Sequence, residues 1–402
     1  MFSPPDALPL PPNPNLDHYK KLAKHLVKAA NHPDPAALAT WAKAWVKHLM
    51  QLSNLQITPT LPVSTDGWAV HLEQFARTEK TSGKLLLTKA QFILARAHGF
   101  ESWPKLSKHI AAVQRKNSPA SAFEQAVECV ITGDKAKLES LLKKNPSLTR
   151  TRSDRQHQAT LLHYVAANGV EGYRQKTPPN AVEIAELLLD AGADVNATAT
   201  LYGPKVATLK LAASSIHPEQ AGLQQHLLEL LLARGAHVDD PTLVTSCLAN
   251  GRLPAAQFLA RRGAPLTLES AAGLGNLDEV KSYFDQKGHL SRTATQREFE
   301  RALLWSAEYG CNEVVEFLLD HGAPIDTKSP DGQTPLHWAV IGGRLDTIRL
   351  LLSRGASLEV ENSYGGTPLG QARWSAENRP KSIDYQSAIA ILIQAEEQKK
   401  KM

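Results

Sequence analysis

The sequence predicts an all-α fold made of repeated helix pairs that follow a small helical domain. From about residue 122 onward, apolar segments of helical length recur between glycines with a period of about 33 residues. Before that point the chain carries amphipathic segments without this period. We therefore expect a Pro-rich lead at 1–15, a basic helical domain at 16–120, an array of about eight repeat units at 121–395, and a charged tail at 396–402.

The helical domain is predicted from amphipathic segments. In LDHYKKLAKHLVKAA the apolar residues share one helical face: Leu16, Tyr19, Leu22 and Leu26. In DPAALATWAKAWVKHLMQL, an Asp-Pro start precedes an apolar stripe at Leu38, Trp41, Trp45 and Leu49. The tryptophans alternate with Ala and Val rather than with arginine, so they are expected in the core and not on a base-stacking surface. QLSNLQITPTLPVSTDG is expected to be a loop, and further helices follow it up to residue 113.

The clearest helix pair lies in DGQTPLHWAVIGGRLDTIRLLLSRGASLEV, residues 331–360. Thr334 can cap a helix, and Pro335 suits its first turn, where no N–H donor is needed. A Gly-Gly turn follows, and Gly355 ends the second helix. Because each helix would have only about two or three turns, which is marginal alone in water, its apolar face has to be covered by a neighbouring copy.

The same register continues on both sides of this pair. Thr367 in YGGTPLGQA lies one full period after Thr334, and Gly310 lies one full period before Gly343. Three successive units therefore share one register. Weaker copies reach back to about residue 122, with insertions at 170–181 and 214–222. The last copy has no closing glycine and is expected to cap the array, with its outer face in water.

The T-P-L-H and L-L-x-x-G-A elements that begin at Thr334 and Leu351 resemble those of ankyrin repeats, whose typical period matches the one observed here. The resemblance is strongest in the last three units and in residues 159–197. It implies a solenoid of stacked helix pairs with short β-hairpin fingers, whose concave face binds a protein. LARAHGFESWPKL, residues 94–106, is similar to a segment that precedes the repeats in bacterial ankyrin proteins.

The resemblance also implies roles for single residues. His163 and His337 occupy the motif histidine, where hydrogen bonds to the Thr cap and to the adjoining unit are expected. Gly251 and Gly275 are closer together than one period, so the finger between their units is expected to be missing.

Charge and cysteine content narrow the class of protein. Residues 1–120 carry 15 Lys and Arg against 7 Asp and Glu, a net +8, whereas residues 121–402 carry 30 against 33, a net −3. The basic part could bind nucleic acid or another anion. Lysines spaced among apolar residues are also typical of a helix that exposes one face to water. With three cysteines, no secretory leader and no long apolar run, we expect a cytoplasmic protein without disulfides or membrane insertion.

No residue pattern indicates catalysis, a cofactor or a metal site. Three N-terminal histidines, His18, His25 and His32, are seven residues apart, whereas two helical ligands of one metal need a spacing of three or four. Cys129 and Cys247 occupy a small-residue position of the repeats and are expected in the core. We therefore expect no catalytic residue, no cofactor and no metal.

The predicted function is a non-catalytic protein-binding scaffold that uses the concave face and fingers of the array. A preformed groove loses little backbone freedom on binding, and a few anchor residues carry most of the affinity. Candidate anchors are residues that the resemblance assigns to this face or that an inserted loop adds: Tyr173, Arg174, Tyr202, Glu308, Tyr309, Asp331, Gln333, Ile341 and Tyr364.

Two alternative functions remain open. One is nucleic-acid or anion binding through the basic helical domain, with an affinity that falls steeply as salt is added. The other is an enzyme whose site lies at the junction of that domain with the array. It would need a polar pocket with a perturbed histidine or cysteine there.

Overall fold

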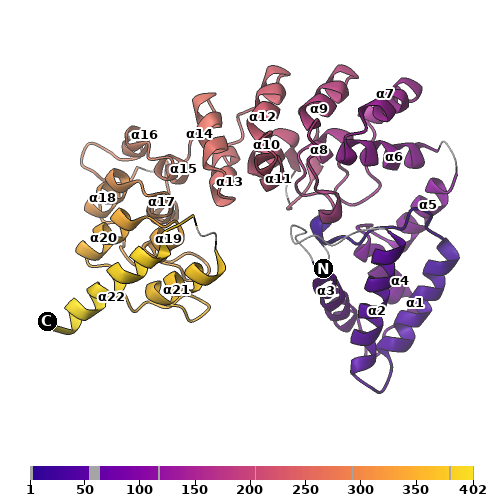
Figure 1. The fold of residues 1–402 in the computed structure, drawn as a ribbon, viewed down its shortest axis with the longest axis horizontal. Coiled ribbons are helices and arrows are strands. Elements are labelled where there is room, and N and C mark those ends of the chain that lie inside the picture. Colours follow the sequence, from indigo (N-terminus) through magenta and orange to yellow (C-terminus); the bar gives the residue numbers. More distant parts are fainter. Residues whose placement is uncertain are drawn as a thin grey trace. The chain divides into compact units, whose positions relative to one another are not determined.

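The computed structural model describes residues 3–53, 64–115, 118–203, 205–291, 293–379 and 382–401, and it is all-α apart from one small hairpin (Figure 1). Two compact units, Met1–His237 and Val238–Met402, make up the chain and are described separately. Most of the loop expected at 51–67 lies outside the described residues. In the ranges above, no helix is both long and apolar enough to cross a membrane.

The first unit begins with a short 3-10 helix and five α-helices: η1 (Pro4–Asp6), α1 (Leu16–Ala30), α2 (Ala36–Leu52), α3 (Thr65–Thr78), α4 (Leu87–Ala97) and α5 (Trp103–Val113). Helix α1 begins where the Asn15 side chain accepts the backbone N–H of Asp17 at 2.8 Å. Its predicted apolar face is buried at Tyr19, Leu22 and Leu26. Trp45 is buried in this core, and its ring stacks at 5.5 Å on that of Trp41, which is partly buried and packs against the same core.

In the part of the first unit that follows α5, the residues that the structure describes form three helix pairs. Their elements are α6 (Pro119–Thr132), α7 (Lys135–Lys144), η2 (Pro146–Thr149), α8 (Leu161–Val165), η3 (Gly172–Arg174), α9 (Ala181–Asp190), β1 (Thr198–Thr200), β2 (Lys205–Ala207), α10 (Thr208–Ser214), α11 (Ile216–Gln220) and α12 (Gln224–Ala233). Helices α6, α8 and α10 contact one another in sequence, as do α7, α9 and α12, so the pairs form two layers (Figure 1). The insertion at 214–222 is folded, because it contains α11.

The insertion at 170–181 folds back onto the N-terminal helices, and this corrects one prediction. Tyr173 is 7% exposed and belongs to the apolar core of α1 to α5. Arg174 is 9% exposed and donates to Glu124 Oε2 at 2.5 Å, while Arg155 pairs with Glu124 at 2.8 Å and with Glu171 at 2.7 Å. A buried guanidinium requires such carboxylate partners. Tyr173 and Arg174 therefore hold the unit together and are not presented to a partner.

The described residues of the second unit form five helix pairs: α13 (Leu243–Ala249) and α14 (Leu253–Arg261), α15 (Leu268–Gly273) and α16 (Leu277–Ser282), α17 (Gln296–Tyr309) and α18 (Asn312–Asp320), α19 (Pro335–Ile341) and α20 (Leu345–Ser353), and α21 (Pro368–Asn378) and α22 (Tyr385–Lys401). Helices α15, α17, α19 and α21 contact one another in sequence and form what we call the inner layer, and α16, α18, α20 and α22 form the outer layer. Leu351 on α20 is fully buried between the layers. Helix α22 continues to Lys401, so the described part of the expected tail is helical.

The fingers are mostly turns rather than hairpins. In the described ranges a strand ladder forms only between β1 and β2, where Ala199 pairs with Val206. The finger predicted to be missing is absent, because α14 ends at Arg261 and α15 begins at Leu268. The expectation of β-hairpin fingers along the array is thus corrected to one hairpin and several tight turns among the described residues.

The motif histidines have the structural role that the resemblance implies. His337 Nε2 donates to the Gly366 carbonyl oxygen at 3.0 Å, so the unprotonated Nδ1 accepts from the Thr334 hydroxyl at 2.8 Å. His163 makes the same pair of contacts with Thr160 and with the next unit. Each histidine joins a helix cap to the following repeat, and burial lowers the pKa of both rings.

Candidate functional site

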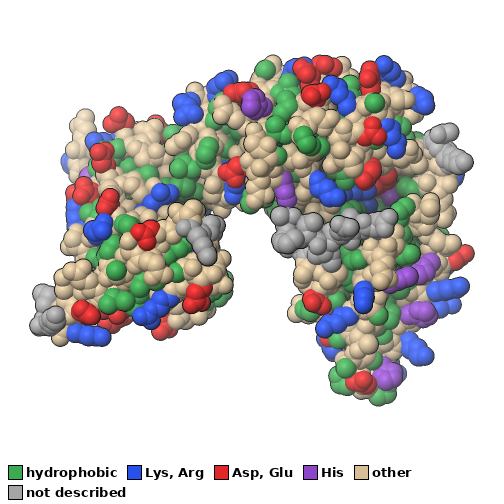
Figure 2. Space-filling view, in the orientation of Figure 1, with side chains coloured by type: hydrophobic (Ala, Val, Ile, Leu, Met, Phe, Trp, Pro, Cys, Tyr) green, Lys and Arg blue, Asp and Glu red, His purple; other side chains and the backbone are tan. Residues whose placement is uncertain are grey.

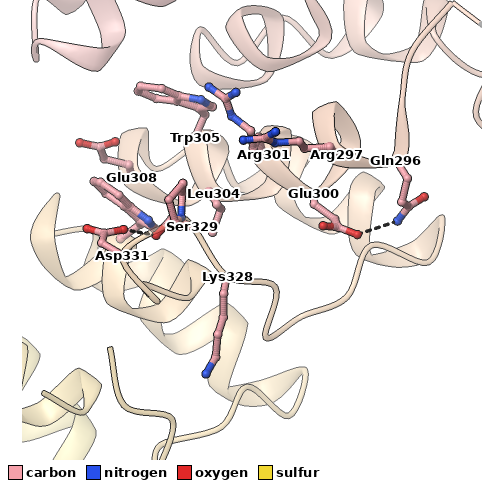
Figure 3. A pocket seen from close by; sticks show the side chains of 12 residues that line it. Gln296, Arg297, Glu300, Arg301, Leu304, Trp305, Glu308, Lys328, Ser329 and Asp331 are labelled. Carbon is pink, nitrogen blue, oxygen red and sulfur yellow. Dashed lines mark hydrogen bonds between the residues drawn. The ribbon is translucent and has the colours of Figure 1, made fainter. Parts of the chain in front are cut away.

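A cavity of about 1030 Å³ opens in the second unit between α17, α19 and the finger at residues 328–331 (Figure 3). We call it the groove. Its lining combines indoles and other apolar groups with side chains of both charge signs: Leu304, Trp305, Pro330, Trp338, Arg297, Arg301, Lys328, Glu300, Glu308 and Asp331.

Helix α17 forms one wall of the groove. Its first turn is fixed by a capping box in which Thr295 N–H donates to Glu298 Oε2 at 2.7 Å and Glu298 N–H donates to Thr295 Oγ1 at 3.2 Å. Trp305 and Glu308 are three residues apart and therefore share a helix face. A Cβ at Gly342 would collide with the Glu308 carbonyl oxygen, so glycine there allows the end of α19 to approach α17 closely.

The finger holds Asp331 at the rim of the groove. Ser329 N–H donates to the Gln333 carbonyl oxygen at 2.9 Å, and Gly332 takes a positive φ of 78° in this turn. The Asp331 carbonyl oxygen accepts Ser363 N–H of the next finger at 2.9 Å. Because hydrogen bonds hold both sides of the turn, the backbone that carries the Asp331 side chain is fixed in position.

Two indoles from successive repeats line the groove. Trp305 and Trp338 are one repeat period apart, so α17 and α19 present them at equivalent positions, and both are half-buried. The Trp305 ring stacks on Tyr309 with 6.2 Å between centroids and 12° between planes. Trp338 Nε1 is buried and lacks a hydrogen-bond partner among the described residues. The groove therefore has aromatic walls.

Charge is divided along the groove. In Figure 3, Glu308 and Asp331 lie at one end, Arg297 and Arg301 lie toward the other, and the side chain of Lys328 extends away. Arg301 is paired with Glu269 at 3.1 Å. No hydrogen bond or ion pair to the Glu308 carboxyl occurs within the described ranges, and burial raises its pKa to about 7 despite the opposing field of Arg379 and Arg344. The acidic end is thus the less neutralised one.

A second cavity of about 490 Å³ shares Asp331 with the groove. Gln333, Ile341 and the 82% exposed Tyr364 line it, together with Trp374 of α21. The surface that begins at α17 therefore continues along the inner layer to α21.

The structure brings together most of the predicted anchors of the second unit. Five of them line the two cavities: Glu308, Asp331, Gln333, Ile341 and Tyr364. Tyr309 lines neither, because its hydroxyl donates to the Leu248 carbonyl oxygen at 2.5 Å and ties α17 to α13. Tyr202 belongs to the first unit, where it is 59% exposed beside β1 and donates to Asn168 Oδ1 at 2.6 Å.

Sequence reasoning missed Trp305 and Trp338 as residues of the groove and Trp374 as a residue of the second cavity. None of the three is among the anchors that the sequence predicts, although Trp305 and Trp338 lie 33 residues apart. Their separation by one repeat period was the available signal, since equivalent positions in successive repeats lie on the same face. Trp374 lies slightly more than one period after Trp338 and does not keep that spacing.

The first unit has a smaller polar pocket of about 340 Å³ where α5 meets the loop at residues 152–158. Lys105, Lys108 and Arg152 line it, with His109 and Asp154. His109 Nδ1 lies 2.8 Å from Asp154 Oδ2. The junction with the array is therefore polar at this point, as the enzyme alternative requires, although no cysteine lines the pocket.

The N-terminal helices carry an exposed basic face. Figure 2 shows Lys, Arg and His side chains gathered over α1, whose sequence includes four lysines and two histidines. No group of three or more His, Cys, Asp and Glu in the described part of the chain is arranged to hold a metal ion. Cys129 and Cys247 are buried, as predicted.

Comparisons with known proteins agree with the repeat register. A family model of ankyrin repeats in three copies matches residues 268–362, which include the whole groove, and a single-copy ankyrin repeat model matches residues 157–200. Neither match reaches residues 94–106, so the resemblance of that segment stays a prediction. No curated protein matches the chain significantly. The chain therefore contains ankyrin repeats in each of its two compact units.

Proposed function

We propose that the second unit binds an extended segment of a partner protein in the groove and along the adjoining cavity of the inner layer. Ankyrin repeats generally mediate protein–protein interactions, and stacked repeats offer extended binding surfaces. The observation that carries the proposal is a cavity of about 1030 Å³ with two half-buried indoles, located within the three-copy match.

The physical chemistry of the groove favours a protein ligand. Tryptophan is enriched among residues that dominate binding energy, because a large rigid ring loses little side-chain entropy when it is covered. The walls are hydrogen-bonded across successive repeats, so the site is formed before the partner arrives. Binding then costs little ordering of this chain. We propose binding without catalysis.

Site-specific photo-crosslinking tests this proposal. A benzophenone amino acid replaces Trp305 in the groove or Arg349, which is exposed on outer helix α20. Irradiation in an extract of the native cells should give a discrete protein adduct from the first position and none from the second. Equal adducts at both positions, or none in the groove, would count against the groove as the binding surface.

A second candidate function is anion binding by the first unit, supported by Lys105, Lys108 and Arg152 around one pocket and by the basic face of α1. Binding of a labelled DNA duplex, measured over a range of salt concentrations, tests it. The affinity should fall steeply with salt and weaken in Lys105→Glu and Lys108→Glu variants. An affinity that does not change with salt would remove this candidate.

A further inference from the structure

We propose that the acidic end of the groove, formed by Trp305, Trp338, Glu308 and Asp331, binds a cationic side chain, lysine or arginine, of the partner segment. This inference rests on the proposed function and names the chemistry of its anchor. Three features support it: the placement of the aromatic rings, the lack of a counterion at the carboxyl groups, and the contacts made by the arginines of this chain.

The aromatic rings suit a cation. Trp305 and Trp338 project from neighbouring inner-layer helices into one cavity. An ammonium or guanidinium group is attracted to the face of an indole more strongly than to any other aromatic side chain in proteins. The long methylene stem of lysine or arginine can at the same time cover the apolar part of the lining, including Leu304 and Pro330.

The carboxylates lack a counterion of their own. The Glu308 carboxyl group has no hydrogen bond or ion pair among the described residues, and burial raises its pKa. Asp331 accepts one hydrogen bond, from the Ser329 hydroxyl, at the rim of the same cavity. A half-buried carboxylate without a partner gains more from an arriving cation than a solvated one does, because little water screens the pair.

Three arginines near the groove, Arg344, Arg379 and Arg301, contact groups other than the Glu308 carboxyl. Arg344 donates its Nε–H to the Glu308 backbone carbonyl oxygen at 3.0 Å and not to the carboxyl group. The Arg379 guanidinium lies over the Trp374 ring at 6.0 Å. Arg301 is paired with Glu269 at 3.1 Å, which also partly neutralises the opposite end of the groove. An external cation is therefore the partner that this end lacks, and an anionic anchor is less favoured.

Selection from a phage library of random peptides on the full-length protein tests the inference. The enriched peptides should contain a required lysine or arginine. Their affinity should fall about tenfold when Glu308→Gln removes the charge, because the basic group of the peptide then loses its carboxylate partner. The matched control is Glu316→Gln, which removes a carboxylate from an exposed position of α18 in the same unit and should change nothing.

A competition assay separates charge from shape. Nα-acetyl-arginine amide should displace the selected peptides, whereas the neutral isostere Nα-acetyl-citrulline amide should not. Peptides that lose binding in Trp305→Ala, yet have no basic residue or keep their affinity in Glu308→Gln, would overturn the inference and leave the proposed function standing. If no selected peptide depends on Trp305, both the proposed function and this inference fail.

Discussion

Replacing Glu308 by glutamine should stabilise the free protein at alkaline pH. Burial raises the pKa of this carboxyl from 4.5 to about 7 in the folded chain. Because the folded pKa lies above the unfolded one, the stabilisation that its protonated form provides is complete below pH 4.5 and is lost as the pH rises through about 7. At about 1.4 kcal/mol per pKa unit, and after allowance for partial exposure to solvent, ionised Glu308 costs about 1–3 kcal/mol at pH 8. Glutamine has nearly the same shape and avoids this cost.

Urea unfolding followed by circular dichroism measures the effect. At about pH 8, Glu308→Gln should have a higher free energy of unfolding than the wild type, and at about pH 4 the two should converge, because both side chains are then neutral. Glu316→Gln should match the wild type at both values. A Glu308→Gln variant that is no more stable than the wild type at pH 8, or that has the same advantage at both pH values, would show that ionised Glu308 does not cost stability.

Three further predictions concern the stack and the junction. Leu351→Ala should lower the free energy of unfolding by about 2–5 kcal/mol, because it leaves a cavity in the fully buried core. Leu350→Ala, on the same helix but partly exposed, should cost less than about half as much. An unchanged urea midpoint for Leu351→Ala would contradict the burial of Leu351. Burial lowers the pKa of His163 to about 4, so the wild type should lose stability as the pH falls from 6.5 to 4. Thermal unfolding at several pH values measures this loss, which should be smaller in the His163→Gln variant. If the thermal midpoint depends on pH in the same way in both proteins, another group is responsible. Tyr173→Ala should cost about 3 kcal/mol or more and increase hydrogen exchange in α1 to α5, and the exposed Tyr202→Ala should cost less than about 1 kcal/mol; equal effects would place Tyr173 outside the core.

The repeat register could be predicted because it is encoded locally. Thr334 and Pro335 begin a helix whatever surrounds them, and Gly355 ends the next one, so the pattern and the observed bounds agree at α19 and α20. The missing finger between α14 and α15 could be predicted because Gly251 and Gly275 are closer together than one repeat period. Resemblance to a repeat family then supplied the contacts of His337, which join units that the local pattern cannot connect.

The packing of the insertion at 170–181 could not be predicted, since its partners are distant in sequence. Glu124 lies 50 residues before Arg174, and neither residue carries a signal that names the other. A loop rich in proline and charge has the same composition whether it projects into water or folds onto a neighbouring core. Tyr173 was therefore assigned to a surface that it does not reach. The two indoles of the groove were not predicted for a different reason. A half-buried tryptophan on an inner helix is compatible with packing as well as with binding.

The two units treat buried carboxylates in contrasting ways, and the contrast supports a binding role for Glu308. Burial opposes ionisation of Glu124 as well, yet Arg155 and Arg174 hold the pKa of that carboxyl at about 2. At Glu308 burial raises the pKa because the fields of Arg379 and Arg344 offset it only in part, whereas at Glu124 the paired arginines outweigh burial. Where a carboxylate serves the packing of this chain, arginines of the same chain neutralise it. At Glu308 the neighbouring arginines bind other groups, and the carboxyl faces a cavity with aromatic walls. An unpaired charge that destabilises the free protein, on a surface formed by repeats of a kind that binds proteins, is accounted for if the counterion arrives with the partner.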